Sequence, residues 1–220
     1  MKIQKNILFT IIVLISTSFT FAQFSHVGLK GGLNLSALDT DNEIELSGYE
    51  NPYKVGLNIG VFTEFDLSKN MSVSAEVLYS QRGMLTEIKP NTEASEHFPE
   101  GIFTLNLDYI DIPILFNYMF ISESNFTPRI FGGPFASFLL SAESAFEGPN
   151  DNEELDMKEF YKPNEFGLVF GLGTTYKINS GELIFDVRFM KGLSDIADFE
   201  GWSKTTSRNI SVNLGYGFKL

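Results

Sequence analysis

The sequence predicts a single eight-stranded antiparallel transmembrane β-barrel that follows an N-terminal export signal. Seven segments alternate apolar and polar residues with a period of two, which indicates strands with one apolar face, and an eighth is a mainly apolar run. The connections between them are alternately short and long, as in outer-membrane barrels. Apolar residues make up 43% of the chain and charged residues 20%, a balance that excludes both a disordered chain and a bundle of membrane-spanning helices.

Residues 1–22 have the pattern of a secretory signal peptide. Two lysines supply the positive start, residues 7–15 form an apolar run, and Ala22 closes a small-x-small cleavage site. The run is shorter than the ~20 residues that a membrane-spanning helix needs, which disfavours an uncleaved anchor. A buried core helix is the other alternative. We expect cleavage after Ala22 and a barrel domain over residues 23–220.

The first three predicted strands share one parity. Over residues 27–36 the odd positions are mostly valine and leucine, and the even positions carry lysine, glycine, asparagine and serine. The same parity holds over residues 55–66 and 71–82, where the polar face includes Glu64 and Glu76. Each of these segments therefore predicts a strand with one apolar and one polar face.

The fourth and fifth segments are irregular. Over residues 103–118 the apolar parity changes from odd to even after Tyr109, which predicts a β-bulge near that residue. Pro113 supports a local irregularity, because proline cannot donate a ladder hydrogen bond. Residues 127–141 are apolar on both parities, so their alternation does not define a polar face.

The last three segments, 165–177, 182–189 and 209–220, return to clean alternation. All eight predicted strands have roughly 10 to 14 residues, the length that lets a tilted strand cross a bilayer. A soluble sandwich would use strands of about 5 or 6 residues.

Connection lengths give an independent signal. An even strand number places both termini on the side of the short turns, which is the periplasmic side of an outer-membrane barrel. The short connections lie near 68–70, 122–125 and 179–181, and the long polar ones near 38–53, 86–102, 142–163 and 194–206.

Parity alone does not say which face points outward, and a lipocalin-like soluble barrel would reverse the two faces. The export signal, strand length and loop asymmetry favour an apolar face toward lipid. Because side chains fill the interior of an eight-stranded barrel, we expect a polar, salt-bridged lumen. Its charges either neutralise one another or line a proton or solute path, and neutralisation is favoured because unpaired charge there is costly. The predicted lumen network is Lys30, Glu76, Arg82, Asp186 and Arg188.

Aromatic residues near the predicted strand ends suit the girdles that form at membrane interfaces. Ordinary strand propensity is the alternative explanation. These residues are Tyr79, Tyr109, Tyr118, Tyr176, Tyr216 and Phe218.

Catalytic and metal chemistry have little support in the sequence. The absence of cysteine excludes disulfides, thiolate metal sites and a cysteine nucleophile. His26 and His97 lack partners at metal-ligand spacing. A pair of His97 with Ser95 would be needed for lipid hydrolysis, and an ordinary surface histidine is favoured. We expect no catalytic residues, no cofactor and no metal.

The acidic stretch 142–163 could hold Ca²⁺ through clustered carboxylates. Its segment 151–156 lacks the glycine and spacing of an EF-hand loop, so a solvated acidic loop is favoured. The net charge of −12 also disfavours a nucleic-acid partner.

Five motifs follow one another along nearly all of the mature chain: Gly28-Leu29-Lys30-Gly31-Gly32-Leu33-Asn34-Leu35, Tyr109-Ile110-Asp111-Ile112-Pro113-Ile114-Leu115, Phe131-Gly132-Gly133-Pro134, residues 166–173 and residues 213–218. Together they resemble the PorT-like outer-membrane β-barrel family of Bacteroidetes. The resemblance implies an outer-membrane location, insertion by the barrel-assembly machinery and, for some members, work in a secretion and gliding apparatus. The final residue, Leu220, departs from the aromatic residue of the assembly signal.

We therefore expect a non-enzymatic outer-membrane protein that acts through surface loops or protein partners. The expected partners are outer-membrane lipid, the barrel-assembly machinery during insertion and proteins of a secretion apparatus. A narrow solute channel is the alternative from a second class, and a lipid-modifying barrel enzyme is a less favoured third.

Overall fold

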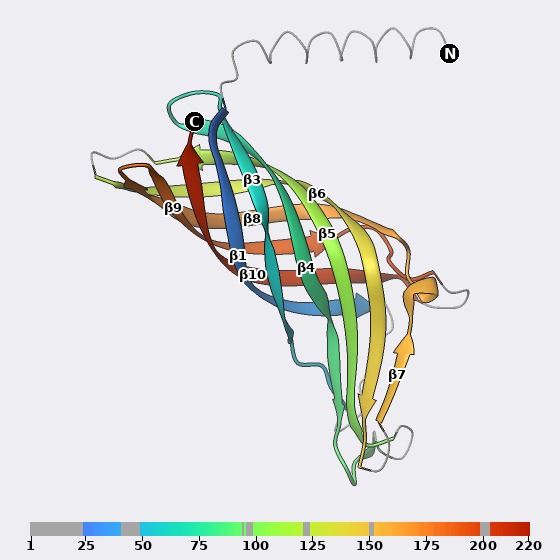
Figure 1. The fold of residues 1–220 in the computed structure, drawn as a ribbon. Helices are drawn as coiled ribbons and strands as arrows, with labels where there is room; N and C mark the ends of the chain where they lie inside the picture. The colour runs from blue at the N-terminus through green and yellow to red at the C-terminus, as the bar shows by residue number, and fades with distance from the viewer. Residues whose placement is uncertain are drawn as a thin grey trace, which may run out of the picture.

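In the computed structural model, eight long antiparallel strands close into a barrel (Figure 1). The structure describes residues 24–40, 49–93, 95, 99–120, 124–149, 152–198 and 203–220, so the predicted signal peptide lies outside the described residues. The strands of the ring are β1 (Phe24–Thr40), β3 (Lys54–Asp66), β4 (Met71–Ile88), β5 (Gly101–Met119), β6 (Phe126–Glu147), β8 (Asn164–Ile178), β9 (Gly181–Gly192) and β10 (Thr205–Lys219).

Each ring strand pairs with the ring strands that precede and follow it in the chain. The β4–β5 ladder and the β1–β10 ladder complete the closure. At the end of the barrel that carries the C-terminus, His26 of β1 pairs with Lys219 of β10. The short turns at 67–70 and 179–180 join neighbouring strands at this same end. The predicted eight-stranded barrel is therefore confirmed. None of the helices in the described ranges is long and apolar enough to span a membrane.

The strands are longer than predicted. Only β3, with 13 residues, and β9, with 12, fall in the expected range, whereas β6 has 22. The additional residues come from the predicted long connections, because β4, β5 and β6 continue to pair beyond the ring (Figure 1). Two short strands, β2 (Tyr49–Glu50) and β7 (Asn152–Asp156), add to this extension by pairing with β4 and β6.

We call this extension the extracellular sheet. It lies at the end opposite the short turns, which is the extracellular end of an outer-membrane barrel. It consists of residues 49–50, 83–88, 101–106, 142–147 and 152–156.

The predicted bulge occurs at the expected level but in the neighbouring strand. Asp108 pairs with Ser141 and Tyr109 pairs with Leu139, so Leu140 of β6 is the extra residue. The buried residues of β5 stay on odd positions throughout. The apolar parity changes because the inward residues of β5 are apolar from Leu105 to Tyr109, whereas its outward residues are apolar from Ile110 onward.

Strand β6 is apolar on both faces because it borders an apolar part of the lumen. Its inward residues Phe131 and Phe135 pack with Leu115, Val169 and Met190. The lumen is thus less polar than predicted, since this cluster lies among its charged residues. Aromatic rings there fill volume that ion pairs alone would leave empty.

The outer surface of the ring is apolar, as predicted. Outward side chains such as Leu29, Ile59 and Leu172 are 59%, 66% and 63% exposed, while the alternate positions are buried. A soluble barrel with an apolar interior would show the opposite arrangement, so the exposed band is the lipid-facing surface.

The predicted aromatic girdle is only partly correct. Tyr118, Tyr176 and Phe218 are exposed near the end with the short turns, and the rings of Tyr216 and Phe218 meet edge to face at 4.7 Å. Tyr79 lies in the middle of β4, and Tyr109 is 1% exposed inside the lumen. Tyr79 is not at a strand end because β4 continues to Ile88. Tyr109 points into the lumen because the inward residues of β5 stay on odd positions along the whole strand.

Candidate functional site

Four of the five predicted lumen residues form one ion-pair cluster, which we call the lower cluster. Lys30 of β1 and Arg188 of β9 are the cations, and Glu76 of β4 and Asp186 of β9 are the carboxylates. Lys30 Nζ lies 2.7 Å from Glu76 and 3.0 Å from Asp186. Arg188 lies 2.7 Å from Glu76 and 2.9 Å from Asp186. Each cation therefore contacts both carboxylates, and the buried cluster is neutral.

The fifth residue, Arg82 of β4, belongs to a separate upper cluster. Its guanidinium nitrogens lie 2.7 Å from Asp111 and 3.0 Å from Glu165, and its carbon lies 4.2 Å from the ring centroid of Tyr109. Sequence analysis missed Asp111 and Glu165 as lumen residues. Their signal was available, because each lies opposite the apolar parity of its segment: Asp111 alternates with Ile110 and Ile112, and Glu165 precedes Phe166.

A third group continues toward the periplasmic end. Arg129 lies 3.4 Å from Glu64 and 4.0 Å from Asp186, which links it to the lower cluster. Ser72 Oγ donates to Glu64 at 2.5 Å. Charged side chains thus follow one another through much of the lumen, and every one named in these three groups has a partner of opposite charge.

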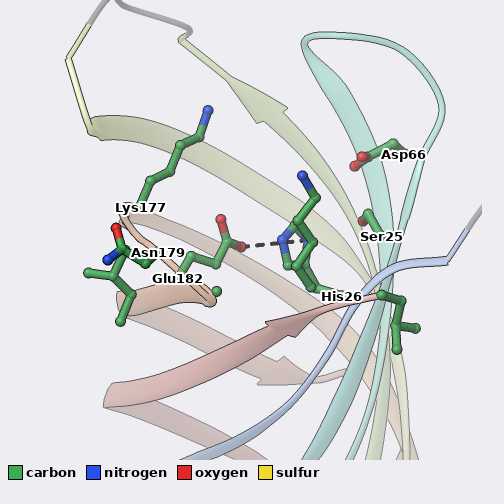
Figure 2. A pocket seen from close by; sticks show the side chains of 10 residues that line it. Ser25, His26, Asp66, Lys177, Asn179 and Glu182 are labelled. Carbon is green, nitrogen blue, oxygen red and sulfur yellow. Dashed lines mark ion pairs between the residues drawn. The ribbon is translucent and has the colours of Figure 1, made fainter.

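The periplasmic mouth holds a cavity of about 620 Å³ (Figure 2). Its lining includes His26 at the start of β1, Asp66 at the end of β3, and Lys177 and Glu182 on either side of the β8–β9 turn. His26 lies within β1, and its Nδ1 is 4.0 Å from a carboxylate oxygen of Glu182. The cavity carries both signs of charge, and so it selects neither cations nor anions strongly.

Two connections fold inward and cover the extracellular mouth. They are residues 157–163, between β7 and β8, and the described part of the β9–β10 connection, residues 193–198. The backbone N–H of Lys162 donates to the backbone oxygen of Ile196 at 2.8 Å, and Tyr161 forms an isolated antiparallel β-bridge with Ala197. We call Tyr161, Ile196 and Ala197 the mouth plug. All three are buried, and burial raises the pKa of Tyr161 to about 12. The plug packs against Leu107, Tyr109 and Leu139 of the lumen and against Leu105 and Ala142 at the base of the extracellular sheet.

A hydrogen-bonded salt bridge holds the plug in place from the solvent side. Lys162 Nζ donates to Asp195 at 2.8 Å, and the same carboxylate accepts from the backbone N–H of Thr205 at 3.0 Å. Partial burial opposes ionisation of Asp195. The bonds from Lys162 and from the backbone N–H groups of Thr205 and Ala197 nevertheless hold its pKa below the ordinary value.

The extracellular sheet presents an acidic outer face. Cross-strand pairing places Glu143 opposite Asp156 and Ala145 opposite Glu154. Like charges directly opposite one another destabilise a strand pair. Within the described ranges, no group of three or more histidine, aspartate or glutamate side chains could hold a metal ion.

The residues considered for lipid hydrolysis are only partly described. Ser95 Oγ donates to the backbone oxygen of Thr92 at 2.8 Å and closes a turn. His97 lies outside the described residues. The structure therefore does not bring a histidine to Ser95 among the residues that it describes.

Comparison with known proteins agrees with this architecture. The family model described as outer membrane protein beta-barrel domain matches residues 21–198. No curated protein matches the sequence.

Solved structures of outer-membrane proteins resemble the chain at low identity. OprG from Pseudomonas aeruginosa shares 13% identity, with a TM-score of 0.49, over 89% of this chain and 97% of its own. Neisserial surface protein A shares 11% identity, with a TM-score of 0.45, over 87% and 97%. Ail from Yersinia pestis shares 12% identity, with a TM-score of 0.43, over 89% and 100%.

The family model covers most of the chain, and its description agrees with the β-barrel that the structure shows. The protein is located in the bacterial outer membrane, and the chain belongs to the family of outer membrane proteins with this beta-barrel domain.

Proposed function

We propose that this protein is a closed, non-enzymatic barrel that acts through its extracellular sheet on a protein partner. The observation that carries the proposal is the contrast between the filled lumen of the ring and the sheet that projects beyond it. The lumen is filled by paired charges and packed side chains, while β4, β5 and β6 project a paired sheet beyond the ring.

Closure of the lumen is supported at three successive levels. The lower cluster joins β1, β4 and β9 across the interior, and the upper cluster joins β4, β5 and β8. Above them, the mouth plug packs on Leu105, Leu107 and Tyr109. A solute would have to separate buried ion pairs and displace the plug, and both steps are costly.

A narrow channel is the alternative that these observations weigh against. It would draw its support from the run of buried charges between the two mouths. A role in a secretion apparatus, which the PorT-like resemblance implies, stays a prediction about the identity of the partner.

Two measurements test the proposal together. We expect the purified, refolded protein to be silent in planar lipid bilayers. A variant that lacks residues 158–163 and 194–198 is the matched control, since it removes the mouth plug and leaves the ring. Steady single-channel conductance from the wild-type protein would replace our proposal with the channel function.

The second measurement is the size of the native complex. We expect extraction from the native membrane in mild detergent to yield an assembly with a stoichiometric partner. A lone barrel of its own mass, obtained under several mild detergents, would argue against action through a protein partner.

A further inference from the structure

We infer that β7 is a docking edge at which an extended, basic segment of a partner protein adds a strand to the extracellular sheet. This inference rests on the proposed function, because it names the surface and the partner chemistry through which that function is carried out. It concerns one edge of one strand and is therefore testable separately.

Strand β7 uses only one of its two edges. The backbone N–H of Met157, just after β7, donates to the oxygen of Ala142 on β6 at 2.8 Å. Backbone groups alternate sides along an antiparallel strand, so Leu155 also directs its groups toward β6. Glu154 and Asp156 have the other parity and direct theirs to the opposite side.

That opposite side of β7 is free among the residues that the structure describes. Strand β7 pairs with β6 and with no other described strand, and it lies at the rim of the sheet (Figure 1). Unpaired N–H and C=O groups along an edge form a template for another strand. Adding a peptide strand to such an edge is an established mode of recognition.

The side chains at this edge specify the charge of the incoming strand. Glu154 and Asp156 are exposed and share the outer face with Glu143 and Glu147 of β6. A strand added beside β7 places its Cβ atoms about 5 Å from those of Glu154 and Asp156. Lysine or arginine there forms cross-strand ion pairs, whereas an acidic residue is repelled.

The inner face of β7 offers one apolar contact at the same edge, beside the exposed carboxylate of Glu153. Leu155 is 58% exposed although it lies in a paired strand. A strand with alternating basic and apolar residues therefore satisfies both faces at once. This pattern is the partner chemistry that the geometry favours.

A second copy of the chain does not meet these requirements. Antiparallel pairing of two β7 strands places the acidic side chains of one copy opposite those of the other. Glu143 already faces Asp156 within one chain, and a further row of carboxylates would add to that repulsion. The occupant is therefore a basic segment of a different protein.

The first test uses synthetic peptides and the full-length protein in nanodiscs. The probe is a fluorescent peptide of four Lys-Val repeats, and the control is a peptide of four Lys-Pro repeats. The two carry equal charge, but proline removes the N–H groups that a ladder needs. We expect the Lys-Val peptide to bind roughly tenfold more tightly by fluorescence anisotropy, since several ladder hydrogen bonds are gained.

Two variants of one residue separate backbone pairing from charge. Glu154→Pro removes an N–H on the free side, and proline is tolerated on an edge strand. We expect it to abolish the preference for the Lys-Val peptide. Glu154→Gln keeps the N–H, so the preference should persist with a binding constant weakened two- to fivefold. Heat-modifiable gel mobility checks that both variants retain the ring, of which β7 is not a part.

Equal binding of the two peptides would overturn the inference and leave only a non-specific acidic surface. A preserved Lys-Val preference in Glu154→Pro would overturn it as well. Self-association of the purified protein that Glu154→Pro abolishes would show a second copy as the occupant instead.

The native complex distinguishes failure of this inference from failure of the proposed function. Glu154→Pro should release the stoichiometric partner from the extracted assembly, while Glu154→Gln should retain most of it. An intact assembly in Glu154→Pro would refute docking at β7 and leave the proposed function standing. Absence of any assembly in the wild-type protein would refute the proposed function itself.

Discussion

Removal of Arg188 from the lower cluster should destabilise the barrel far more than removal of a surface cation. The Arg188 guanidinium lies 2.7 Å from Glu76 and 2.9 Å from Asp186, and its side chain is 2% exposed. In Arg188→Met, Lys30 remains as one cation between two buried carboxylates. Leaving a buried charge uncompensated costs about 3–5 kcal/mol, so we expect the free energy of unfolding to fall by that amount.

A double variant shows whether the loss comes from charge imbalance. In Arg188→Met/Glu76→Gln, the remaining pair of Lys30 and Asp186, 3.0 Å apart, is neutral. We expect a total loss of only about 1–2 kcal/mol, the value of one or two hydrogen bonds. The coupling energy between Arg188 and Glu76 should then be about 2 kcal/mol or more.

Urea unfolding from lipid vesicles at pH 7, followed by heat-modifiable gel mobility, measures these differences. Lys89→Met is the control, since the Lys89–Glu50 pair is exposed on both sides and solvent screens it, so its loss should change the free energy of unfolding far less. Additive losses from Arg188→Met and Glu76→Gln, or a loss in Arg188→Met no larger than in the control, would refute the reasoning.

Three further changes test other parts of the structure. Leu172→Arg should lower the free energy of unfolding by about 2–4 kcal/mol in the same urea assay, because Leu172 faces lipid. Leu155→Arg should change it very little, because Leu155 is similarly exposed but lies outside the lipid-facing surface. Equal losses in the two variants would contradict the position of the lipid-facing surface. Gly28→Val should prevent folding into vesicles, because a Cβ at this position would lie 2.2 Å from the backbone oxygen of Tyr216 and 2.4 Å from the ring of Phe62. Normal heat-modifiable mobility of this variant would count against this packing. The bonds that lower the pKa of Asp195 stabilise the mouth plug above about pH 4 and are lost as pH falls through the lowered pKa, so protease cleavage of residues 193–198 should rise in acid. Asp195→Asn should remove that pH dependence, and an unchanged profile would exclude Asp195 as its source.

Much of the barrel could be predicted because its constraint is local. Each strand must show lipid one face and the lumen the other, so parity is written into consecutive residues. This rule located seven of the eight ring strands and the four charged residues that meet in the lower cluster, whereas β6 was predicted only as an apolar run. It failed where a face changes character along a strand, as in β5 above Tyr109.

The sequence alone could not group the lumen charges. Parity says that Lys30, Glu76, Arg82 and Arg188 point inward, but not at which height each lies. Height depends on the register between strands, which ladder pairing decides across long sequence separations. Register places Arg82 with Asp111 and Glu165 rather than with Glu76.

The extracellular sheet also required tertiary structure. Residues 142–147 and 152–156 lie in the acidic stretch 142–163, whose many carboxylates are typical of a solvated loop. They become strands because β4, β5 and β6 continue to pair and present an edge on which β7 can form.

The amino-acid sequence by itself determined the barrel and its strand number, because these follow from the alternation and spacing of neighbouring residues, and its export signal, strand lengths and loop asymmetry indicated which face meets lipid. Only the tertiary structure decided which charges neutralise one another, that the mouth is plugged and where an edge is left free, because these depend on contacts between residues far apart in the chain.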